Sequence, residues 1–252
     1  MFELKNRVAI VTGSGSEKGI GRTIALTLAK QGAAVVIADI NYAGVQDTVN
    51  AITEAGGKAL GVELNVTSKE SCDAMVEKTL QTFGRIDILV NNAGISQKVT
   101  VQDMTLEDIT RIFSVNMFGL FLCTQSVLET MKKQKFGRII SLSSVSAKRG
   151  GGVFGGPHYS ASKAAVLGFS KNLAREVALD GITVNCVAPG LVNTEIWKSL
   201  PEEDAKSVIA GIPMGRPGET SEVAATIAFL ASEEASYITG EDIDINGGSH
   251  MD

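Results

Sequence analysis

The sequence has few of the residues that mark small cross-linked proteins and metal proteins. Three of its 252 residues are cysteine and five are proline. Cys72, Cys123 and Cys186 stand far apart and are odd in number, so they fit neither a disulfide framework nor the spacing of metal ligands. We therefore expect no metal site and a reducing compartment. A chain of this length buries enough surface to fold without cross-links.

Long apolar runs and basic clusters are also missing. No uncharged apolar stretch approaches the roughly 18 residues that suggest a transmembrane helix, and the start "MFELKNR" lacks the apolar core of a signal peptide. The formal net charge is −5, and no run of Lys and Arg offers a surface to nucleic acid. We expect a cytoplasmic protein that acts on a small molecule and binds neither membrane nor nucleic acid.

Short apolar runs rich in Val and Ile recur along the chain and alternate with helix-like stretches. Most runs are nearly continuous, which is typical of strands covered on both faces of a parallel sheet. The alternation predicts one doubly wound α/β domain over 1–252, a Rossmann-type parallel sheet of about seven strands with helices on both faces. The runs are "VAIVTG", "AAVVIAD", "KALGVEL", "IDILVNN", "GRIISLSS", "ITVNCVAP" and "DIDING". The helical stretches cover 19–31, 42–55, 69–83, 105–132, which opens with the capping-box-like "TLED", and 158–180.

One segment, approximately 191–219, interrupts this alternation. It holds three of the prolines and the only tryptophan, Trp197. It is too long for an ordinary connection between a strand and a helix. Because it follows "NCVAPG" at the end of a strand, we predict a lid over a site at the carboxyl ends of the strands. Trp197 would form an apolar wall of that lid, with simple core packing as the alternative.

The glycine-rich stretch "TGSGSEKGIG", residues 12–21, lies between a strand and a helix. Gly13 and Gly15 match the first two positions of the dinucleotide fingerprint G-x-G-x-x-G, but the third falls on Lys18. Gly19 and Gly21 stand where the helix begins. Backbone N–H groups and the positive end of that helix would hold a phosphate here. A plain turn is the alternative.

Asp39 ends the second apolar run, close to the spacing at which dinucleotide-binding proteins place an acid. Such an acid accepts hydrogen bonds from the adenosine ribose and repels a 2′-phosphate. It therefore favours NAD over NADP. Lys18 opposes this preference, because a cation beside the loop can pair with a 2′-phosphate. A helix N-cap is the structural alternative for Asp39.

The stretch "YSASK" places Tyr159 and Lys163 at positions i and i+4, on one face of a helix. A nearby ammonium group stabilises phenolate, so we expect Lys163 to lower the pKa of Tyr159. A tyrosine tuned in this way exchanges a proton with an alcohol or a carbonyl oxygen. Upstream, the run "RIISLSS" ends in Ser144, which could hold the substrate oxygen or simply form a turn.

Together these features resemble the short-chain dehydrogenase/reductase family, in its group of about 250 residues. The resemblance covers essentially the whole chain. Its further markers are "NNAG" at 91–94, Asn116 in "SVNMFG", "APG" at 188–190 and "YITGEDIDINGG" near the end. Two segments depart from the family pattern: Ser14 to Lys18 is two residues longer than usual, and so is the interval from Ser144 to Tyr159.

The resemblance implies roles for individual residues. Tyr159 would be the general acid/base, and Lys163 would lower its pKa and bind the nicotinamide ribose. Ser144 would orient the substrate oxygen, and Asn116 would hold a water that links Lys163 to solvent. Asn92 would also brace the central strands. The implied cofactor contacts are Gly13, Ser16, Gly19, Ile20, Gly21, Asp39, Ile40, Asn65, Val66, Asn92, Ala93, Gly94, Tyr159, Lys163, Pro189, Gly190, Val192 and Thr194.

The implied reaction is hydride transfer between NAD(H) and a secondary alcohol or ketone. We expect a polyol, a sugar or another small secondary alcohol, which Ser144, His158 and Trp197 would contact. The alternative is a 3-oxoacyl-[acyl-carrier-protein] reductase, an activity that usually uses NADPH, and a further alternative is a non-catalytic nucleotide-binding regulator. The resemblance also implies a homotetramer, assembled through 105–132, 158–180 and the last strand.

Overall fold

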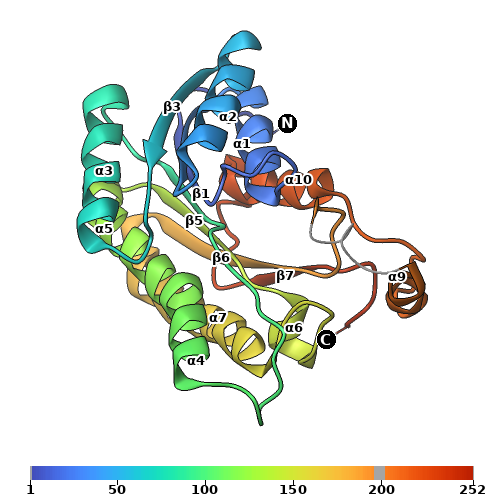
Figure 1. The fold of residues 1–252 in the computed structure, drawn as a ribbon. Helices are drawn as coiled ribbons and strands as arrows, with labels where there is room; N and C mark the ends of the chain where they lie inside the picture. The colour runs from blue at the N-terminus through green and yellow to red at the C-terminus, as the bar shows by residue number, and fades with distance from the viewer. Residues whose placement is uncertain (1, 196–201, 252) are drawn as a thin grey trace.

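The computed structural model describes residues 2–195 and 202–251. Seven strands form one sheet in the order β3-β2-β1-β4-β5-β6-β7, and each neighbouring pair is parallel (Figure 1). The predicted doubly wound parallel sheet is therefore confirmed. The strands are β1 (Val8–Thr12), β2 (Ala34–Asp39), β3 (Lys58–Glu63), β4 (Ile88–Asn91), β5 (Gly137–Leu142), β6 (Ile182–Pro189) and β7 (Asp242–Ile245).

Helices cover both faces of this sheet because successive strand residues point to opposite sides. On β1, Ala9 and Val11 pack in one core with α1, α2 and α10, whereas Ile10 packs in another with α3, α5 and α7. The helices are α1 (Ile20–Lys30), α2 (Tyr42–Glu54), α3 (Lys69–Phe83), α4 (Leu106–Phe113), α5 (Leu120–Gln134), α6 (Val145–Arg149), α7 (Pro157–Val177), α9 (Glu202–Ala210) and α10 (Thr220–Ala231). Single turns η2 (Ala178–Asp180) and η3 (Glu233–Ala235) follow α7 and α10.

The helix predicted over 105–132 has a wider turn in its middle. It begins with a capping box, in which Thr105 and Asp108 exchange side-chain-to-backbone hydrogen bonds. A π-helical turn, η1 (Ser114–Gly119), then separates α4 from α5. The side chain of Asn116 in this turn bonds both main-chain polar groups of Ile95. Single π-turns of this kind are frequent at functional sites.

The strand order reverses between β1 and β4, and this creates a crevice at their carboxyl ends. β1 pairs with β2 on one side and with β4 on the other. The loops that leave these strands run in opposite directions over the sheet. Open parallel sheets bind their ligands at such a switch point.

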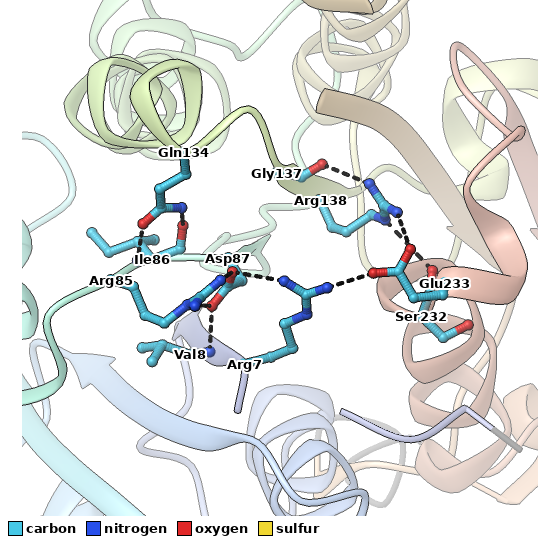
Figure 2. Close-up of polar contacts among 10 residues, drawn as sticks. All are labelled: Arg7, Val8, Arg85, Ile86, Asp87, Gln134, Gly137, Arg138, Ser232 and Glu233. Atoms are coloured by element: carbon cyan, nitrogen blue, oxygen red, sulfur yellow. Dashed lines mark hydrogen bonds and ion pairs between the residues drawn. The ribbon is translucent and has the colours of Figure 1, made fainter. Parts of the chain in front are cut away.

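At the opposite edge of the sheet, a buried carboxylate ties strand starts together (Figure 2). Asp87 is fully buried just before β4. Its Oδ2 accepts from the Val8 N–H at 2.8 Å and from Arg85 Nε at 2.8 Å. Its Oδ1 accepts from Arg85 Nη2 at 2.6 Å and from Arg7 Nη1 at 3.3 Å. Each oxygen is thus satisfied by charged or backbone donors.

The same network reaches β5 and the turn after α10. Arg7 bonds Glu233 at 2.5 Å, and Arg138 lies 3.5 Å from the other oxygen of that carboxylate (Figure 2). The guanidinium carbons of Arg7 and Arg138 lie 3.7 and 4.4 Å from the centre of the Phe136 ring, which is cation–π distance.

Within the described residues, Leu106–Gln134 has the length and composition of a membrane-crossing helix, with 39% of its most apolar window buried. Core helices pass the same test. This stretch packs against α3 and α7 in the fold, so it carries no argument for a membrane.

Candidate functional site

A cleft of about 920 Å³ lies at the carboxyl edge of the sheet. Its walls come largely from the loops that follow the six strands β1 to β6. Every residue that the sequence proposed for cofactor binding lines this cleft, as does Ser144. Motifs spread over almost the whole chain therefore meet in one place.

The glycines of the glycine-rich loop allow close packing against neighbouring backbone. Gly13 has a φ of 66°, and a Cβ there would lie 2.6 Å from the Ala93 Cα. A Cβ on Gly21 would lie 2.3 Å from the Gly13 carbonyl oxygen. α1 begins after Gly19 without a side-chain cap, so its first N–H groups are left for an anion. These features fit the pyrophosphate of a dinucleotide.

Asp39 is held at the end of β2 beside that loop. Its Oδ2 accepts from the Gly15 N–H at 2.8 Å and its Oδ1 from the Asn41 N–H at 2.9 Å. An ionised carboxylate has about four lone-pair sites, so each oxygen can accept a further hydrogen bond. The carboxylate is thus fixed in orientation and still able to bind hydroxyl groups.

Lys18 lines the same cleft and pairs with an acid from another part of the chain. Its Nζ lies 3.0 Å from Glu195 Oε1, in the segment that follows β6. The sequence placed Lys18 near the adenosine ribose, and the structure pairs it with an acid of the segment after β6 that also lines the cleft.

Ser144 and Tyr159 meet on the other half of the cleft. Ser144 caps α6 by accepting from the Ser146 N–H at 3.2 Å, and it also hydrogen-bonds Tyr159. Tyr159 lies in the first turn of α7. The Gly155 backbone packs on its ring, because a Cβ there would lie 2.4 Å from the ring carbon Cδ1. A larger residue at 155 would displace the ring.

The two pKa values differ from the sequence-based expectation. Burial raises the pKa of Tyr159 above 10, and only its hydrogen bond with Ser144 acts in the opposite direction. Lys163 donates from Nζ to the Leu142 carbonyl at 2.7 Å, and burial lowers its pKa to about 8. The expected lowering of the Tyr159 pKa by Lys163 is therefore not seen. The ammonium faces the end of β5, and burial disfavours both charged forms.

The buried ammonium group of Lys163 should lower the free energy of unfolding of the wild type. We expect Lys163→Met to raise the free energy of unfolding at pH 7 by about 1–3 kcal/mol, because a tenfold change in a protonation equilibrium corresponds to about 1.4 kcal/mol and the lost hydrogen bond offsets part of the gain. Below pH 8 the wild type carries the charged group in both the folded and the unfolded state. Between pH 8 and 10.5 only its unfolded state keeps the proton, so the wild type gains stability as pH rises.

Urea unfolding of both proteins at pH 7 and about pH 9.5 measures this effect. The advantage of Lys163→Met should shrink at the higher pH. An advantage that is equal at both values, or a loss at pH 7, would contradict the buried-charge account.

Asn116 does not line the cleft, but its side chain bonds residues next to the site. Its Oδ1 accepts from the Ile95 N–H at 2.8 Å, and its Nδ2 donates to the Ile95 carbonyl and to Ser162 Oγ, both at 3.0 Å. Ser162 Oγ in turn donates to the Tyr159 carbonyl at 2.8 Å. A Cβ on Gly94 would lie 3.4 Å from Lys163 Nζ and 3.3 Å from Asn116 Oδ1. Asn116 thus connects the loop after β4 to the helix that carries Tyr159 and Lys163.

Two other asparagines shape the adenosine half. Asn92 Nδ2 donates to the carbonyls of Thr12 and Gly13 at 2.9 and 2.7 Å, which joins the ends of β1 and β4. Asn65 Oδ1 accepts from the N–H and the hydroxyl of Thr67. The side-chain oxygen of Asn65, one of the implied cofactor contacts, is therefore engaged locally.

Of the predicted substrate contacts, Ser144 lines the cleft but His158 does not. His158 is only 3% exposed, its Nε2 lies 3.3 Å from Gln97 Oε1, and it does not line the cleft. It lies at the start of α7 but faces the loop after β4, and burial lowers its pKa. Trp197 lies outside the described residues.

Several cleft residues carry no motif and were missed from the sequence. Leu191, Glu195 and Val208 come from the segment after β6, Arg111 lies on α4, and the others flank Ser144 or Tyr159. The position of Val145 directly after Ser144 is a signal that would have found it. The missed apolar residues include Val145, Val153, Phe154, Leu191 and Val208, and the missed charged residues are Arg111 and Glu195.

Comparison with known proteins gives full-length matches. The family model described as "Enoyl-(Acyl carrier protein) reductase" matches residues 13–250. Three relatives are each 42% identical. The uncharacterized short-chain type dehydrogenase/reductase y4mP of Sinorhizobium fredii aligns over 97% of this chain and 98% of its own. The (2S)-[(R)-hydroxy(phenyl)methyl]succinyl-CoA dehydrogenase subunit BbsD of Thauera aromatica aligns over 98% of each. The 3-oxoacyl-[acyl-carrier-protein] reductase FabG of Escherichia coli aligns over 99% of this chain and 100% of its own.

The crystal structure of gox2181 superimposes with a TM-score of 0.94 at 36% identity, over 98% of this chain and 97% of that one. Fold, cleft and full-length similarity agree with one another. The chain belongs to the short-chain dehydrogenase/reductase family of oxidoreductases, which act on CH–OH groups.

Proposed function

We propose that this protein transfers a hydride between NAD(H) and a 3-hydroxyacyl or 3-oxoacyl thioester. The observation that carries the proposal is the convergence of Ser144, Tyr159 and Lys163 on one wall of the cleft. A bound nicotinamide cofactor would supply the hydride acceptor or donor. The glycine loop would hold its pyrophosphate and Asp39 its adenosine ribose.

The chain's own residues would manage the proton. In reduction, the Tyr159 hydroxyl donates its proton to the carbonyl oxygen as that oxygen becomes an alcohol, and in oxidation it receives the proton back. Ser144 would fix the substrate oxygen beside Tyr159 through a hydrogen bond. Lys163 would bind the nicotinamide ribose from the same helix, while Asn116 holds α7 in place.

The thioester is supported by the lining of the cleft and by two relatives. The names of FabG and BbsD both describe acyl thioesters that carry a ketone or an alcohol. Val145, Val153 and Phe154 line the cleft beside Ser144 and Tyr159 in the sequence, and Leu191 and Val208 line it from the segment after β6. Apolar side chains of this kind suit an acyl chain. A polyol or sugar, which the sequence suggested first, would bring several hydroxyl groups against these apolar side chains and leave them without partners.

A direct substrate comparison tests this proposal. With NADH, acetoacetyl-N-acetylcysteamine should be reduced, and in the reverse direction 3-hydroxybutyryl-N-acetylcysteamine should be oxidised with a kcat/KM at least about tenfold above that of sorbitol or glucose. Absorbance at the NADH band reports both directions. A higher kcat/KM for the polyols would overturn the thioester assignment and restore the sugar-type substrate.

The preference for NAD rests on Asp39 and on the partner of Lys18. We expect NADH to bind more tightly than NADPH. Asp39→Ser should lower the ratio of the NADPH to the NADH dissociation constant about tenfold, because it removes a carboxylate that faces a 2′-phosphate. Glu195→Gln should lower it several-fold, because Lys18 is then released to pair with that phosphate.

NADH and NADPH fluorescence titrations measure these ratios. Glu54→Gln, at the exposed end of α2, removes a carboxylate far from the cleft and should leave the ratio unchanged. Tighter binding of NADPH by the wild type would refute the proposed cofactor. An unchanged ratio in Glu195→Gln would show that Lys18 contributes nothing to the choice.

Two expectations from the sequence complete the proposal. The segment 191–219 would act as a lid. This is supported by the β-bridge between Val192 and Gly218, which brings the two ends of the segment together.

A homotetramer is supported by exposed apolar side chains on α4, η1 and α5, namely Leu106, Ile109, Phe118 and Phe121. Light scattering of the purified protein gives the oligomeric state. The cytoplasmic location stays a prediction.

A further inference from the structure

The short helix α6 sends its two basic residues in different directions. Lys148 is nearly buried, with Nζ 3.1 Å from Asp242 and 2.8 Å from Asp244 on β7. Its charge is compensated inside the fold. Arg149 instead lines the cleft, and its Nη1 donates to the Ser249 carbonyl at 3.0 Å. No carboxylate lies within 4.0 Å of Arg149 in the described part of the chain.

α6 also sets the distance between this charge and the reacting oxygen. Ser144 is the N-cap of α6, and Arg149 is its last residue. At about 1.5 Å per residue, the two Cα atoms are separated by roughly 7–8 Å along the helix. Val145 and Arg149 stand at i and i+4 on one helix face, and both line the cleft. Next to Ser144, α6 therefore presents one apolar side chain and, one turn further on, one guanidinium group to the cleft.

The other guanidinium at the cleft is less available. Arg111 Nη2 donates to Gln97 Oε1 at 2.8 Å. Its charge acts on the Asp108 carboxyl, and hydrogen bonds from Thr105 and Gln97 are the larger causes that lower the pKa of that carboxyl to about 2. Asp108 is thus ionised, and its charge acts on Arg111. Among the described residues, no carboxylate lies within 4.0 Å of either cleft arginine, and Arg149 differs from Arg111 in that its hydrogen-bond partner is a main-chain carbonyl.

We propose that Arg149 binds an oxyanion of the substrate. The Ser249 carbonyl accepts from one of its five N–H groups and orients the fork, so the others can bind a carboxylate or a phosphate. This inference rests on the proposed thioester function and narrows it to an anionic thioester. The oxyanion is either a carboxylate on the acyl chain or a phosphate on the carrier arm, and the substrates below distinguish these sources.

Three ketone substrates separate the possibilities. Acetoacetyl-N-acetylcysteamine is a neutral thioester. 3-Oxoadipyl-N-acetylcysteamine adds a carboxylate on the acyl chain, and acetoacetyl-CoA adds phosphates on the carrier. For each anionic substrate, kcat/KM is divided by that of the neutral thioester, in the wild type and in Arg149→Gln, Arg149→Lys and Arg175→Gln. Arg175 is an exposed arginine of α7 outside the cleft and provides the matched control.

We expect Arg149→Gln to lower one of these two ratios about tenfold or more, the usual worth of a charge-assisted hydrogen bond. Arg149→Lys should recover part of it, and Arg175→Gln should leave it unchanged. A carboxylate-specific loss identifies the acyl chain, and a CoA-specific loss identifies the carrier. Both ratios unchanged in Arg149→Gln would overturn the inference. Melting temperatures show that each variant is folded.

A binding measurement keeps this test independent of the proposed reaction. If no thioester is turned over, the thioester function fails, and Arg149 is then tested with glutarate and with inorganic phosphate. Each anion is titrated into the enzyme–NADH complex with NADH fluorescence as the readout. Weaker binding by Arg149→Gln than by Arg175→Gln supports the oxyanion site. Equal binding by both variants, or no binding by the wild type, overturns it.

Discussion

Tyr159→Phe should reduce kcat with every accepted substrate by about 10²–10⁴-fold, the usual contribution of a positioned proton donor. The substitution removes only the hydroxyl, while the ring keeps its packing against Gly155. NADH should bind within several-fold of wild type, because the phosphate loop and Asp39 are untouched. Turnover is followed by NADH absorbance, and binding by NADH fluorescence.

A matched control makes the loss specific. Tyr237 is fully exposed and does not line the cleft, so Tyr237→Phe makes the same chemical change without consequence for turnover. Turnover that persists in Tyr159→Phe would remove Tyr159 from the reaction. A wild type that binds NADH but turns over no ketone or alcohol would favour a nucleotide-binding regulator.

The cofactor half of the cleft was predictable because its residues sit where strands end. Parallel strands align their carboxyl ends, so a motif placed directly after an apolar run has a known position in the fold. Gly13 after β1 and Asp39 at the end of β2 were found from this rule together with the dinucleotide fingerprint, and Asn92 after β4 was implied by the family resemblance. Their side chains or backbone lie where the alternation of strands and helices places them.

The substrate half was less accessible to sequence reasoning. Lys18 and Glu195 are far apart in the chain, and only the return of the segment after β6 brings them together. Lys148 and Arg149 are adjacent and chemically alike, yet Lys148 pairs with two aspartates of β7 in the fold and Arg149 lines the cleft. Tertiary packing decides such directions, and no local spacing encodes them.

The direction of the Lys163 ammonium illustrates the same limit. Its i, i+4 spacing from Tyr159 places both residues on one helix face. The spacing does not say that the Leu142 carbonyl lies within 2.7 Å of Nζ. Strand β5 supplies that acceptor, and burial then determines the pKa of both groups.

The largest effect on stability should come from Asp87, at the edge of the sheet opposite the cleft (Figure 2). Asp87→Asn keeps the shape of the side chain but removes its charge. One amide oxygen cannot replace both carboxylate oxygens, so the Val8 N–H, Arg85 and Arg7 compete for a single acceptor. The guanidinium groups then keep their charge beside a buried neutral group.

We expect Asp87→Asn to lower the free energy of unfolding by about 3 kcal/mol, the lower end for a broken buried ion pair. The lower end applies because the side chains of Arg7 and Arg85 are 24% and 40% exposed and regain water. For a chain of this size the loss corresponds to a fall in Tm of roughly 6–12 °C. Urea unfolding and thermal melts at a fixed protein concentration measure both quantities.

Glu233→Gln provides the contrast within the same network. Glu233 is 61% exposed, so its removal should cost less than about 1 kcal/mol even though it pairs with Arg7 and Arg138. Similar losses in the two variants would show that burial of the carboxylate is not what matters. If Asp87→Asn does not accumulate as a folded protein, Arg85→Gln tests the same pair, and a loss below about 1 kcal/mol there would refute its importance. Neither variant should alter kcat at room temperature, because the strands separate this network from the cleft by their full length.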